Sequence, residues 1–251
     1  MSGQLFVIGL GPGQESMVTG QAAAALYAAD VVIGYTGYFA WIEDLVMGKE
    51  CVALPLTQEA ERARMAVERV LQGETVCVIS SGDAGIYGMA SLVLEMAEQQ
   101  DAASPVPDVT VIPGISAVNA CAALLGAPIG HDFAVISLSD LLTPWATIEK
   151  RLMAAAEADF VTALFNPKSA RRDWQYARAQ AILAQHRAPH TPVGVVRNAY
   201  RPDQSVMITT VAEMADAPVD MLTTVIVGNS QTRRWQSRMV TPRGYTVADT
   251  R

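Results

Sequence analysis

The hydrophobic and polar positions of this chain alternate between short apolar runs and longer segments with helical spacing. Apolar runs at 5–10, 30–35, 75–79 and 109–112 have the length and residue types of buried strands. Most of these runs lead into segments whose small or apolar residues recur at helical intervals. This alternation predicts a parallel sheet with helical crossovers in the first part of the chain.

The pattern shifts near 125–131 and then resumes. Further strands are predicted at 133–138, 159–165, 192–197, 206–211 and 223–228, with helices at 145–156 and 173–185. Because the shift falls at a typical domain size, we place a boundary within 113–130. The predicted fold is therefore two α/β domains, residues 1–118 with a mainly parallel sheet and residues 119–251 with a mixed sheet.

A glycine-rich turn at 80–90 lies between the predicted strand 75–79 and the next helix. It contains Gly82, Gly85 and Gly88, with Asp83 in its middle and Tyr87 one helical turn later. The carboxyl end of a strand in an open α/β sheet is where ligands bind. A glycine turn alone is weak evidence, so an ordinary strand-to-helix connection is an equally good interpretation at this point.

A second glycine-rich turn, residues 9–13, resembles a dinucleotide fingerprint but does not meet its requirements. Gln14 occupies the third glycine position, and Pro12 has no N–H to offer a phosphate. Gly34 stands where an acid would meet the ribose. No phosphate-binding Walker sequence occurs either, so this turn has a different purpose.

Composition narrows the classes of partner. About half of the residues are hydrophobic and the net charge is −7, which argues against nucleic acid or an anionic membrane as the main partner. The beginning of the chain lacks the basic segment that opens a signal peptide, so we do not expect one. The longest apolar stretch is interrupted by polar and helix-breaking residues, so we do not expect a transmembrane helix either. Three cysteines without paired spacing predict buried thiols in the cytoplasm, and the three histidines show no metal-ligand pattern with them.

Several short motifs follow one another in a set order that resembles the tetrapyrrole methylase family of S-adenosylmethionine (SAM) dependent enzymes. The resemblance covers nearly the whole chain and rests on Gly9-Leu10-Gly11-Pro12-Gly13, Gly82-Asp83, Pro113-Gly114-Ile115-Ser116, Phe165-Asn166-Pro167 and Thr223-Thr224. Residues 80–90, Gln58-Glu59-x-x-Arg62 and Phe165-Asn166-Pro167-x-Ser169 resemble one branch of the family. That branch methylates C17 of precorrin-3B, with ring contraction to precorrin-4 in cobalamin biosynthesis, or acts on cobalt-factor III in the anaerobic route.

The resemblance implies a fold, a cofactor and a set of contacts. The active site would lie in the cleft between the two α/β domains, SAM would be the cofactor, and the protein would be a homodimer. The SAM contacts would fall on Pro12, Ser81, Gly82, Asp83, Ile86, Ser116, Ala117, Phe165, Asn166, Ala199, Thr224 and Val225. One departure matters, because several relatives carry a proton-transfer acid where this chain has Gly34.

The chemistry suggests further residues. Methyl transfer depends mainly on positioning, whereas ring contraction needs general acid–base groups. Our candidates are Tyr35, Tyr87 and Glu59, although phenols are often hydrogen-bonded core residues and Glu59 suits the first turn of a helix. Arginine forks suit the acetate and propionate groups of the precorrin substrate. We therefore name Arg62, Arg171, Arg172, Arg197 and Arg201, with a solvated surface pair as the alternative for Arg171 and Arg172.

Other functions remain open from the sequence. The chain resembles other corrinoid C-methyltransferases, such as the enzyme that methylates C11 of precorrin-4, and related proteins methylate RNA or a protein side chain. The acidic balance weighs against RNA. A non-catalytic protein that binds a tetrapyrrole or a nucleotide is a further alternative. The choice between the metal-free and the cobalt-containing substrate is not made by any motif.

Overall fold

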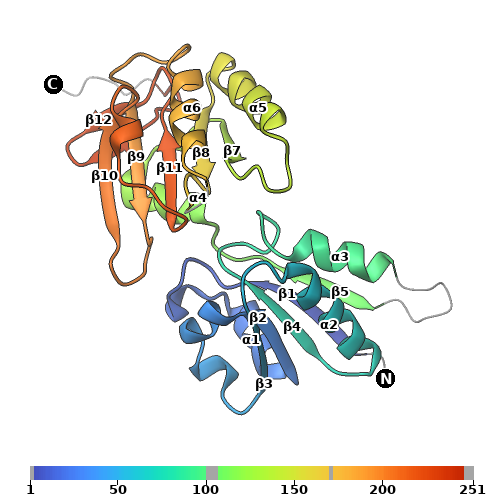
Figure 1. The fold of residues 1–251 in the computed structure, drawn as a ribbon. Coiled ribbons are helices and arrows are strands. Elements are labelled where there is room, and N and C mark those ends of the chain that lie inside the picture. The colour runs from blue at the N-terminus through green and yellow to red at the C-terminus, as the bar shows by residue number, and fades with distance from the viewer. Residues whose placement is uncertain (1–2, 100–106, 170–171, 246–251) are drawn as a thin grey trace. The chain divides into compact units, whose positions relative to one another are not determined.

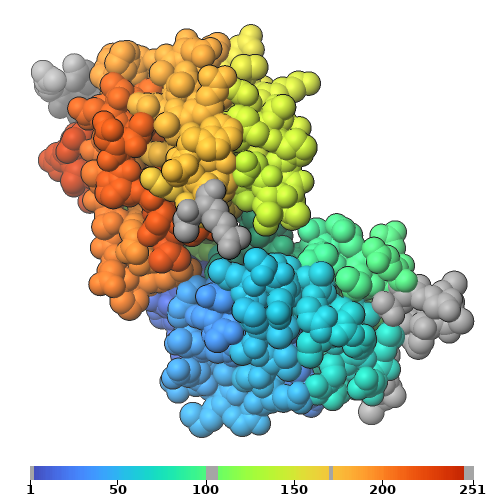
Figure 2. Space-filling view, viewed as in Figure 1, coloured from blue at the N-terminus to red at the C-terminus, as the bar shows by residue number. Residues whose placement is uncertain are grey.

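The computed structural model describes residues 3–99, 107–169 and 172–245. The chain in it divides into two compact units, Met1–Ala117 and Val118–Arg251. Figure 1 traces the backbone of each unit, and Figure 2 shows the same view in space-filling form, with the first unit blue to green and the second green to red. The units are described separately. No helix of the described residues is long and apolar enough to cross a membrane.

The first unit is built around a five-stranded parallel sheet, in the order β3-β2-β4-β1-β5. Its described helices and strands are β1 (Gln4–Gly9), a 3₁₀ turn (Glu15–Met17), α1 (Gly20–Ala28), β2 (Val31–Tyr35), two 3₁₀ segments (Thr36–Trp41 and Asp44–Val46), β3 (Glu50–Leu54), α2 (Glu59–Leu71), β4 (Val76–Ser80), α3 (Ala90–Glu98) and β5 (Asp108–Ile112). The predicted parallel sheet is therefore confirmed.

Alternation along the strands gives this sheet two apolar faces. Val7 and Val78 belong to a core cluster with residues of α2 and α3. The next residues, Ile8 and Ile79, belong to a second cluster with residues of α1. Because successive side chains of a strand point to opposite faces, continuous apolar runs are what a sheet covered on both sides requires.

The strand order creates one distinctive place at the edge of this sheet. From β1 the chain crosses over to β2 on one side, and from β4 it crosses over to β5 on the other side. The loops that leave the neighbouring strands β1 and β4 therefore diverge. Such a topological switch point, at the carboxyl ends of parallel strands, is where open α/β sheets bind ligands.

The second unit has a five-stranded mixed sheet, in the order β10-β9-β11-β8-β7. Its described elements are α4 (Ala117–Leu125), β6 (Gly126–Ala127), β7 (Phe133–Ser137), α5 (Trp145–Glu157), β8 (Val161–Phe165), α6 (Trp174–Leu183), β9 (Pro192–Arg197), β10 (Ser205–Thr210), a 3₁₀ turn (Met214–Asp216), β11 (Thr223–Val227), β12 (Arg233–Trp235) and β13 (Arg238–Val240). Only β7 and β8 pair in parallel, and the other pairings are antiparallel. The predicted mixed sheet is confirmed.

The strand directions bring several segments to one edge of this second sheet. Strands β7, β8 and β9 end there, and β10 and β11 begin there, because both run antiparallel to β9. Helices α5 and α6 share a core cluster with Val195 and Val225 on one face. Helix α4 shares another with Val196 and Ile226 on the opposite face. The loops at this edge are therefore anchored by a sheet with two packed faces.

Four short strands were not anticipated from the sequence. Strand β3 lies at the edge of the first sheet, and β12, β13 and β6 form a separate three-stranded sheet. All three residues of β12 are exposed, so they have no apolar alternation that would identify a strand.

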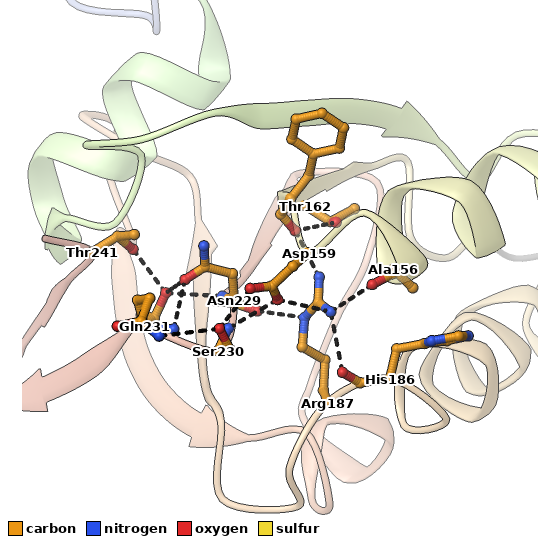
Figure 3. A network of polar contacts seen from close by, with 12 residues as sticks. Ala156, Asp159, Thr162, His186, Arg187, Asn229, Ser230, Gln231 and Thr241 are labelled. Carbon is orange, nitrogen blue, oxygen red and sulfur yellow. Dashed lines mark hydrogen bonds and ion pairs between the residues drawn. The ribbon is translucent and has the colours of Figure 1, made fainter. Parts of the chain in front are cut away.

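The opposite edge of the second sheet is held by a buried arginine (Figure 3). Arg187, between α6 and β9, donates to the carbonyl oxygens of Ala156 at 2.8 Å, Phe160 at 2.9 Å and Gly228 at 3.1 Å. Its guanidinium also lies 3.1 Å from a carboxylate oxygen of Asp159. Asp159 in turn accepts hydrogen bonds from the backbone and hydroxyl of Ser230. This network joins the start of β8 to the end of β11.

Candidate functional site

The loops that follow β1 and β4 are joined to each other at the switch point. The backbone N–H of Leu10 donates to Ser80 O at 2.9 Å. Gly11 and Gly82 exchange two hydrogen bonds, at 3.0 and 2.8 Å, and form an isolated antiparallel bridge. The two glycine turns identified in the sequence are thus one structural feature.

The loop after β5 packs onto this pair, backbone against backbone. A Cβ atom on Gly114 would lie 2.2 Å from Gly82 O and 2.5 Å from Gly9 O. Gly9 is equally confined, since a Cβ there would lie 2.6 Å from Gly114 N. Glycine at positions 9 and 114 is therefore required by the close approach of three loops. Gly82 is required for a different reason, its φ of +65°.

Asp83 ties the same three-loop junction together through its side chain. One carboxylate oxygen accepts from Gly85 N at 2.8 Å, and the other accepts from Gly114 N at 3.0 Å. The carboxylate thus connects the loop after β4 to the loop after β5. Ile86 and Tyr87, three and four residues later, are 38% and 58% exposed. The loop therefore presents an apolar and a phenolic side chain to solvent beside a fixed carboxylate.

The other cofactor residues expected in the first unit lie on the same three loops. Pro12 and Ser116 are buried, and Ala117 is half-buried at the start of α4. Ser81 donates from its hydroxyl to the Tyr38 hydroxyl at 3.2 Å. The junction therefore brings together, at the carboxyl edge of one sheet, Pro12, Ser81, Gly82, Asp83, Ile86, Ser116 and Ala117.

The candidate base Tyr35 belongs to a small aromatic cluster. Its ring meets that of Tyr38 edge-on, with the centroids 5.1 Å apart, and Tyr38 lies 5.0 Å from Trp41. The segment Thr36–Trp41, which carries Tyr38 and Trp41, is a 3₁₀ helix. The Ser81–Tyr38 hydrogen bond links this cluster to the loop after β4. Tyr38 was not named as a candidate residue, because packing between helices was the favoured interpretation of this aromatic cluster and a wall for a large flat ligand was the alternative.

Position 34, where the family resemblance leads one to expect an acid, has no room for a side chain. A Cβ on Gly34 would lie 2.3 Å from Cγ1 and 2.7 Å from Cδ1 of Ile79. Ile79 is 1% exposed and sits in the core cluster next to α1. The side chain of Ile79 thus fills the space that a side chain at position 34 would need.

Glu59 and Arg62 form a pair at the start of α2. Arg62 donates to a Glu59 carboxylate oxygen at 2.8 Å and to Pro55 O at 3.0 Å. The Arg62 residue is only 4% exposed. Its guanidinium therefore fixes the connection from β3 to α2, and a role for Arg62 in holding substrate, like a catalytic role for Glu59, stays a prediction.

The expected cofactor residues of the second unit meet at the edge where β7, β8 and β9 end. Asn166 directly follows β8, has a φ of 52°, and donates from its amide to Ser137 Oγ at 3.0 Å. Ala199 follows β9, beside Asn198 with a φ of 50°. Left-handed backbone at non-glycine residues is uncommon and gathers at functional sites. The edge contains Phe165, Asn166, Ala199, Thr224 and Val225.

Two of these residues have limited access to a ligand. The Val225 side chain is fully buried in the cluster beneath α5 and α6, so only its backbone remains for a contact. Thr224 is 7% exposed. It lies beside Cys121 and hydrogen-bonds to it. Burial raises the pKa of the Cys121 thiol to about 11, whereas the hydrogen bond with Thr224 acts to lower that pKa. The sequence identified the positions, but side-chain contact at Val225 is excluded by its burial.

The arginines at this edge differ from one another. Arg172 is 8% exposed and donates to Asn166 O and to Leu138 O, so it is neither the surface residue of the alternative interpretation nor an open fork. Arg197 pairs with Asp220 at 2.7 Å. Arg201 is half-buried just after β9, and Arg171 lies outside the described residues. Substrate roles for all four stay predictions.

Among the described residues, no group of three or more His, Cys, Asp or Glu side chains could hold a metal ion. The polar groups described at the two sheet edges are backbone groups, hydroxyls, guanidiniums and the carboxylates of Asp83, Asp140 and Asp220.

The family model of the Tetrapyrrole (Corrin/Porphyrin) Methylases matches residues 4–215 of this sequence. The chain belongs to the tetrapyrrole methylase family. Every motif named for the resemblance except Thr223-Thr224 falls within the matched residues. The family predicted from the motif order is thus confirmed.

Curated relatives narrow the branch. A protein of Priestia megaterium named cobalt-factor III methyltransferase is 50% identical over 98% of this chain, and this chain covers 46% of it. A Salmonella typhimurium protein named probable cobalt-factor III C(17)-methyltransferase is 48% identical over 97% of this chain and 100% of the relative. A Sinorhizobium precorrin-3B C(17)-methyltransferase is 39% identical over 93% and 91%. The chain therefore groups with the C17-methyltransferases of cobalamin biosynthesis, and it spans about half the length of some of these relatives.

Solved structures agree with this placement. The crystal structure of the methyltransferase CobJ has a TM-score of 0.89 and 38% identity, and covers 96% of this chain and 100% of its own. A uroporphyrin-III C-methyltransferase of Thermus thermophilus, solved with S-adenosylhomocysteine, has a TM-score of 0.67 at 20% identity over 90% and 92%. The second likeness concerns the fold alone.

Proposed function

We propose that this protein transfers a methyl group from SAM to C17 of precorrin-3B and drives ring contraction to precorrin-4. The observation that carries the proposal is the identity with relatives named for C17 methylation, which extends over nearly the whole chain. The three-loop junction supports it, because that junction supplies a built ligand edge at the switch point of a parallel sheet.

The residues of the junction fit SAM as a ligand. SAM combines a flat base, a ribose, an amino-acid end and a sulfonium, and when bound it supplies an electrophilic methyl group. The loops offer backbone N–H and C=O groups with little side-chain cover, the fixed carboxylate of Asp83, and the exposed side chain of Ile86. In the second unit, Asn166 and the backbone around Thr224 and Ala199 offer polar groups at a sheet edge. These residues would hold and orient the cofactor, and orientation is the main demand of an in-line displacement.

Ring contraction requires proton transfers, and the chain offers phenols for them. Tyr87 lies on the loop after β4 and is 58% exposed, so its hydroxyl can face a bound molecule. Tyr35 is half-buried in the aromatic cluster that contacts this loop through Tyr38 and Ser81. Tyr87 is the better placed of the two, and we propose it as general acid or base. Glu59 is engaged by Arg62 and ranks below both.

The cobalt-containing macrocycle is a second candidate substrate. Relatives named for cobalt-factor III are 50% and 48% identical to this chain, compared with 39% for the relative named for precorrin-3B. This difference favours cobalt-factor III as the macrocycle to test beside precorrin-3B.

The deciding assay is an absorbance time course with methyl-labelled SAM and either macrocycle. The proposal predicts one label incorporated per macrocycle, with the spectral change of ring contraction, on precorrin-3B, on cobalt-factor III or on both. Label transfer to neither would refute C17 methylation.

The cofactor site has its own test, in the variants Asp83→Asn and Tyr87→Phe. An amide at position 83 accepts one backbone N–H but turns its own N–H₂ toward the other, so the affinity for SAM should fall about tenfold or more. Tyr87→Phe should bind SAM normally and lose turnover. An unchanged SAM affinity in Asp83→Asn, measured by calorimetry, would remove Asp83 from the cofactor site.

A further inference from the structure

Four exposed apolar side chains lie at the edge of the second sheet where β7, β8 and β9 end. Leu141 and Leu142 lie in the loop between β7 and α5 and are 80% and 94% exposed. Met221 and Leu222 lie just before β11 and are each 49% exposed. Because β7 ends and β11 begins at the same sheet edge, both segments belong to that edge. We call these four side chains the apolar rim. In Figure 1 the first segment is the yellow-green loop that joins β7 to α5.

A single buried guanidinium connects the segments that carry the apolar rim. Arg172 donates to Leu138 O at 3.1 Å and to Met221 Sδ at 3.5 Å. Its Nε lies 4.0 Å from a carboxylate oxygen of Asp140, and the other oxygen of Asp140 accepts from Gln175 at 2.9 Å. The start of the β7–α5 loop, the segment before β11 and the first turn of α6 are therefore held as one assembly.

The apolar rim is continuous with the expected cofactor residues. Arg172 also donates to Asn166 O. The backbone oxygen of Leu222 accepts from Asn198 N at 3.0 Å, one residue before Ala199. Arg197 is paired with Asp220 at the same edge, so a charged group borders the apolar side chains. The rim thus adjoins the end of β8 and the end of β9.

Large exposed aliphatic side chains on one surface usually mark an interaction site. The apolar rim lies at the sheet edge that also contains the expected cofactor residues, so we expect it to contact a ligand. A tetrapyrrole macrocycle has a broad apolar face and carboxylates at its periphery, which matches an apolar patch bordered by arginine. We propose that Leu141, Leu142, Met221 and Leu222 form the seat for the apolar face of the tetrapyrrole, and that Arg172 is the residue that positions this seat. The proposal rests on the proposed function, because it takes the substrate class from it.

The seat can be tested by binding alone, with uroporphyrin III as a stable carboxylated tetrapyrrole. The test variant is Leu141→Ser/Leu142→Ser, which changes two exposed loop residues and leaves the core intact. The control is Leu94→Ser, an exposed leucine of α3 in the first unit. Binding is followed by quenching of tryptophan fluorescence, and SAM affinity is measured in parallel.

We expect the double variant to raise the dissociation constant for uroporphyrin III at least tenfold and to leave that for SAM within twofold. Leu94→Ser should change neither. Equal porphyrin affinity in the double variant and the wild type, or no porphyrin binding by the wild type, would overturn the seat. A change confined to the oligomeric state, measured by sedimentation, would also overturn it and assign the rim to a protein contact.

Arg172 needs a readout that a purely structural role would not move. Arg172→Lys keeps a charge at the centre of the assembly, whereas Arg172→Gln removes it. We expect Lys to retain porphyrin affinity better than Gln, because Lys can still donate to the carbonyl oxygens that Arg172 holds. Equal porphyrin affinities of the two folded variants would overturn the positioning role. Rim-dependent porphyrin binding without methyl transfer to either corrinoid would support the seat and refute only the proposed reaction.

Discussion

Replacing Arg187 by methionine is expected to destabilise the second unit by about 3–5 kcal/mol. The side chain of Arg187 is 1% exposed, so its hydrogen bonds are made where water has almost no access. Methionine fills much of the same volume but donates no hydrogen bond, which leaves the carbonyl oxygens of Ala156, Phe160 and Gly228 without their donor. Each unsatisfied buried group costs about 1–3 kcal/mol. The carboxylate of Asp159 is 40% exposed, so water can hydrate it once Arg187 is gone and it adds little to the loss. The expected destabilisation therefore lies toward the lower end of what three unsatisfied carbonyl groups would cost together.

Urea unfolding followed by tryptophan fluorescence measures this loss. Three of the four tryptophans, Trp145, Trp174 and Trp235, lie in the second unit, so the signal reports mainly on it. With a slope of about 1–3 kcal/mol per molar urea, the midpoint should fall by at least about 1 M. In a thermal scan the same loss corresponds to roughly 6–20 °C, at about 2–4 °C per kcal/mol.

Arg178→Met is the matched control, because it removes an exposed arginine that pairs with Glu149 on the surface. Exposed pairs contribute about 0–1 kcal/mol, so this variant should stay close to the wild type. Folded Arg187→Met should still bind SAM, since Arg187 lies at the sheet edge opposite the candidate site. A loss below about 1 kcal/mol in Arg187→Met, or one equal to that of the control, would refute the reasoning.

Three further predictions follow from other features. Gly114→Ala should weaken SAM binding at least tenfold and lower the free energy of unfolding by about 1–3 kcal/mol, because the new methyl group would lie 2.2 Å from Gly82 O. Calorimetry and urea unfolding measure these two effects, with Gly20→Ala as the control because nothing lies within 4 Å of a Cβ there. Equal SAM affinities of the two variants would contradict the prediction. Of the three thiols, only Cys51 is exposed, and burial raises the pKa of Cys77 to about 12 and that of Cys121 to about 11. A thiol reagent at mildly alkaline pH should therefore modify one cysteine in the folded protein and three in denaturant, and rapid reaction of more than one native thiol would be inconsistent. Burial acts to raise the pKa of Asp220, but hydrogen bonds from Arg197 and Thr223 outweigh it and hold that pKa below its ordinary value. The stability from this carboxylate should be present above about pH 4 and be lost as the pH falls further, so Asp220→Asn should flatten the acid limb of the stability curve.

Much of the fold could be predicted, because each buried strand of the two main sheets carries its own apolar run. The switch point could also be located in outline, since Gly9, Gly82 and Gly114 mark the loops that meet there. Side-chain roles were harder to predict. Arg62 and Arg172 were named as substrate forks because they lie beside the motif loops, and their burial could not be expected from the sequence because charged residues are rarely buried. Each is enclosed because its guanidinium satisfies backbone carbonyl groups, which have no trace in a residue pattern.

Other features of the structure could not be read from the sequence, for equally specific reasons. Tyr38 contacts the loop after β4 through the Ser81 hydroxyl, 43 positions along the chain, a separation that no local periodicity reveals. The parity of Val225 along β11 puts its side chain under α5 and α6, although its sequence position belongs to the site. Strand β12 lacks apolar alternation because all three of its residues are exposed, and β13 is only three residues long.

The contact between position 34 and Ile79 also constrains how this protein can change. An acid at position 34 has no room while Ile79 keeps its Cγ1 at 2.3 Å from the new Cβ, so Gly34→Asp alone should be damaging. Ile79→Ala alone would open a cavity in the core and be damaging too. Each substitution relieves the defect that the other causes, so the two are tolerated better together than separately. Whether position 34 can carry any side chain is thereby decided by the core residue at position 79, so these two positions constrain each other's substitution.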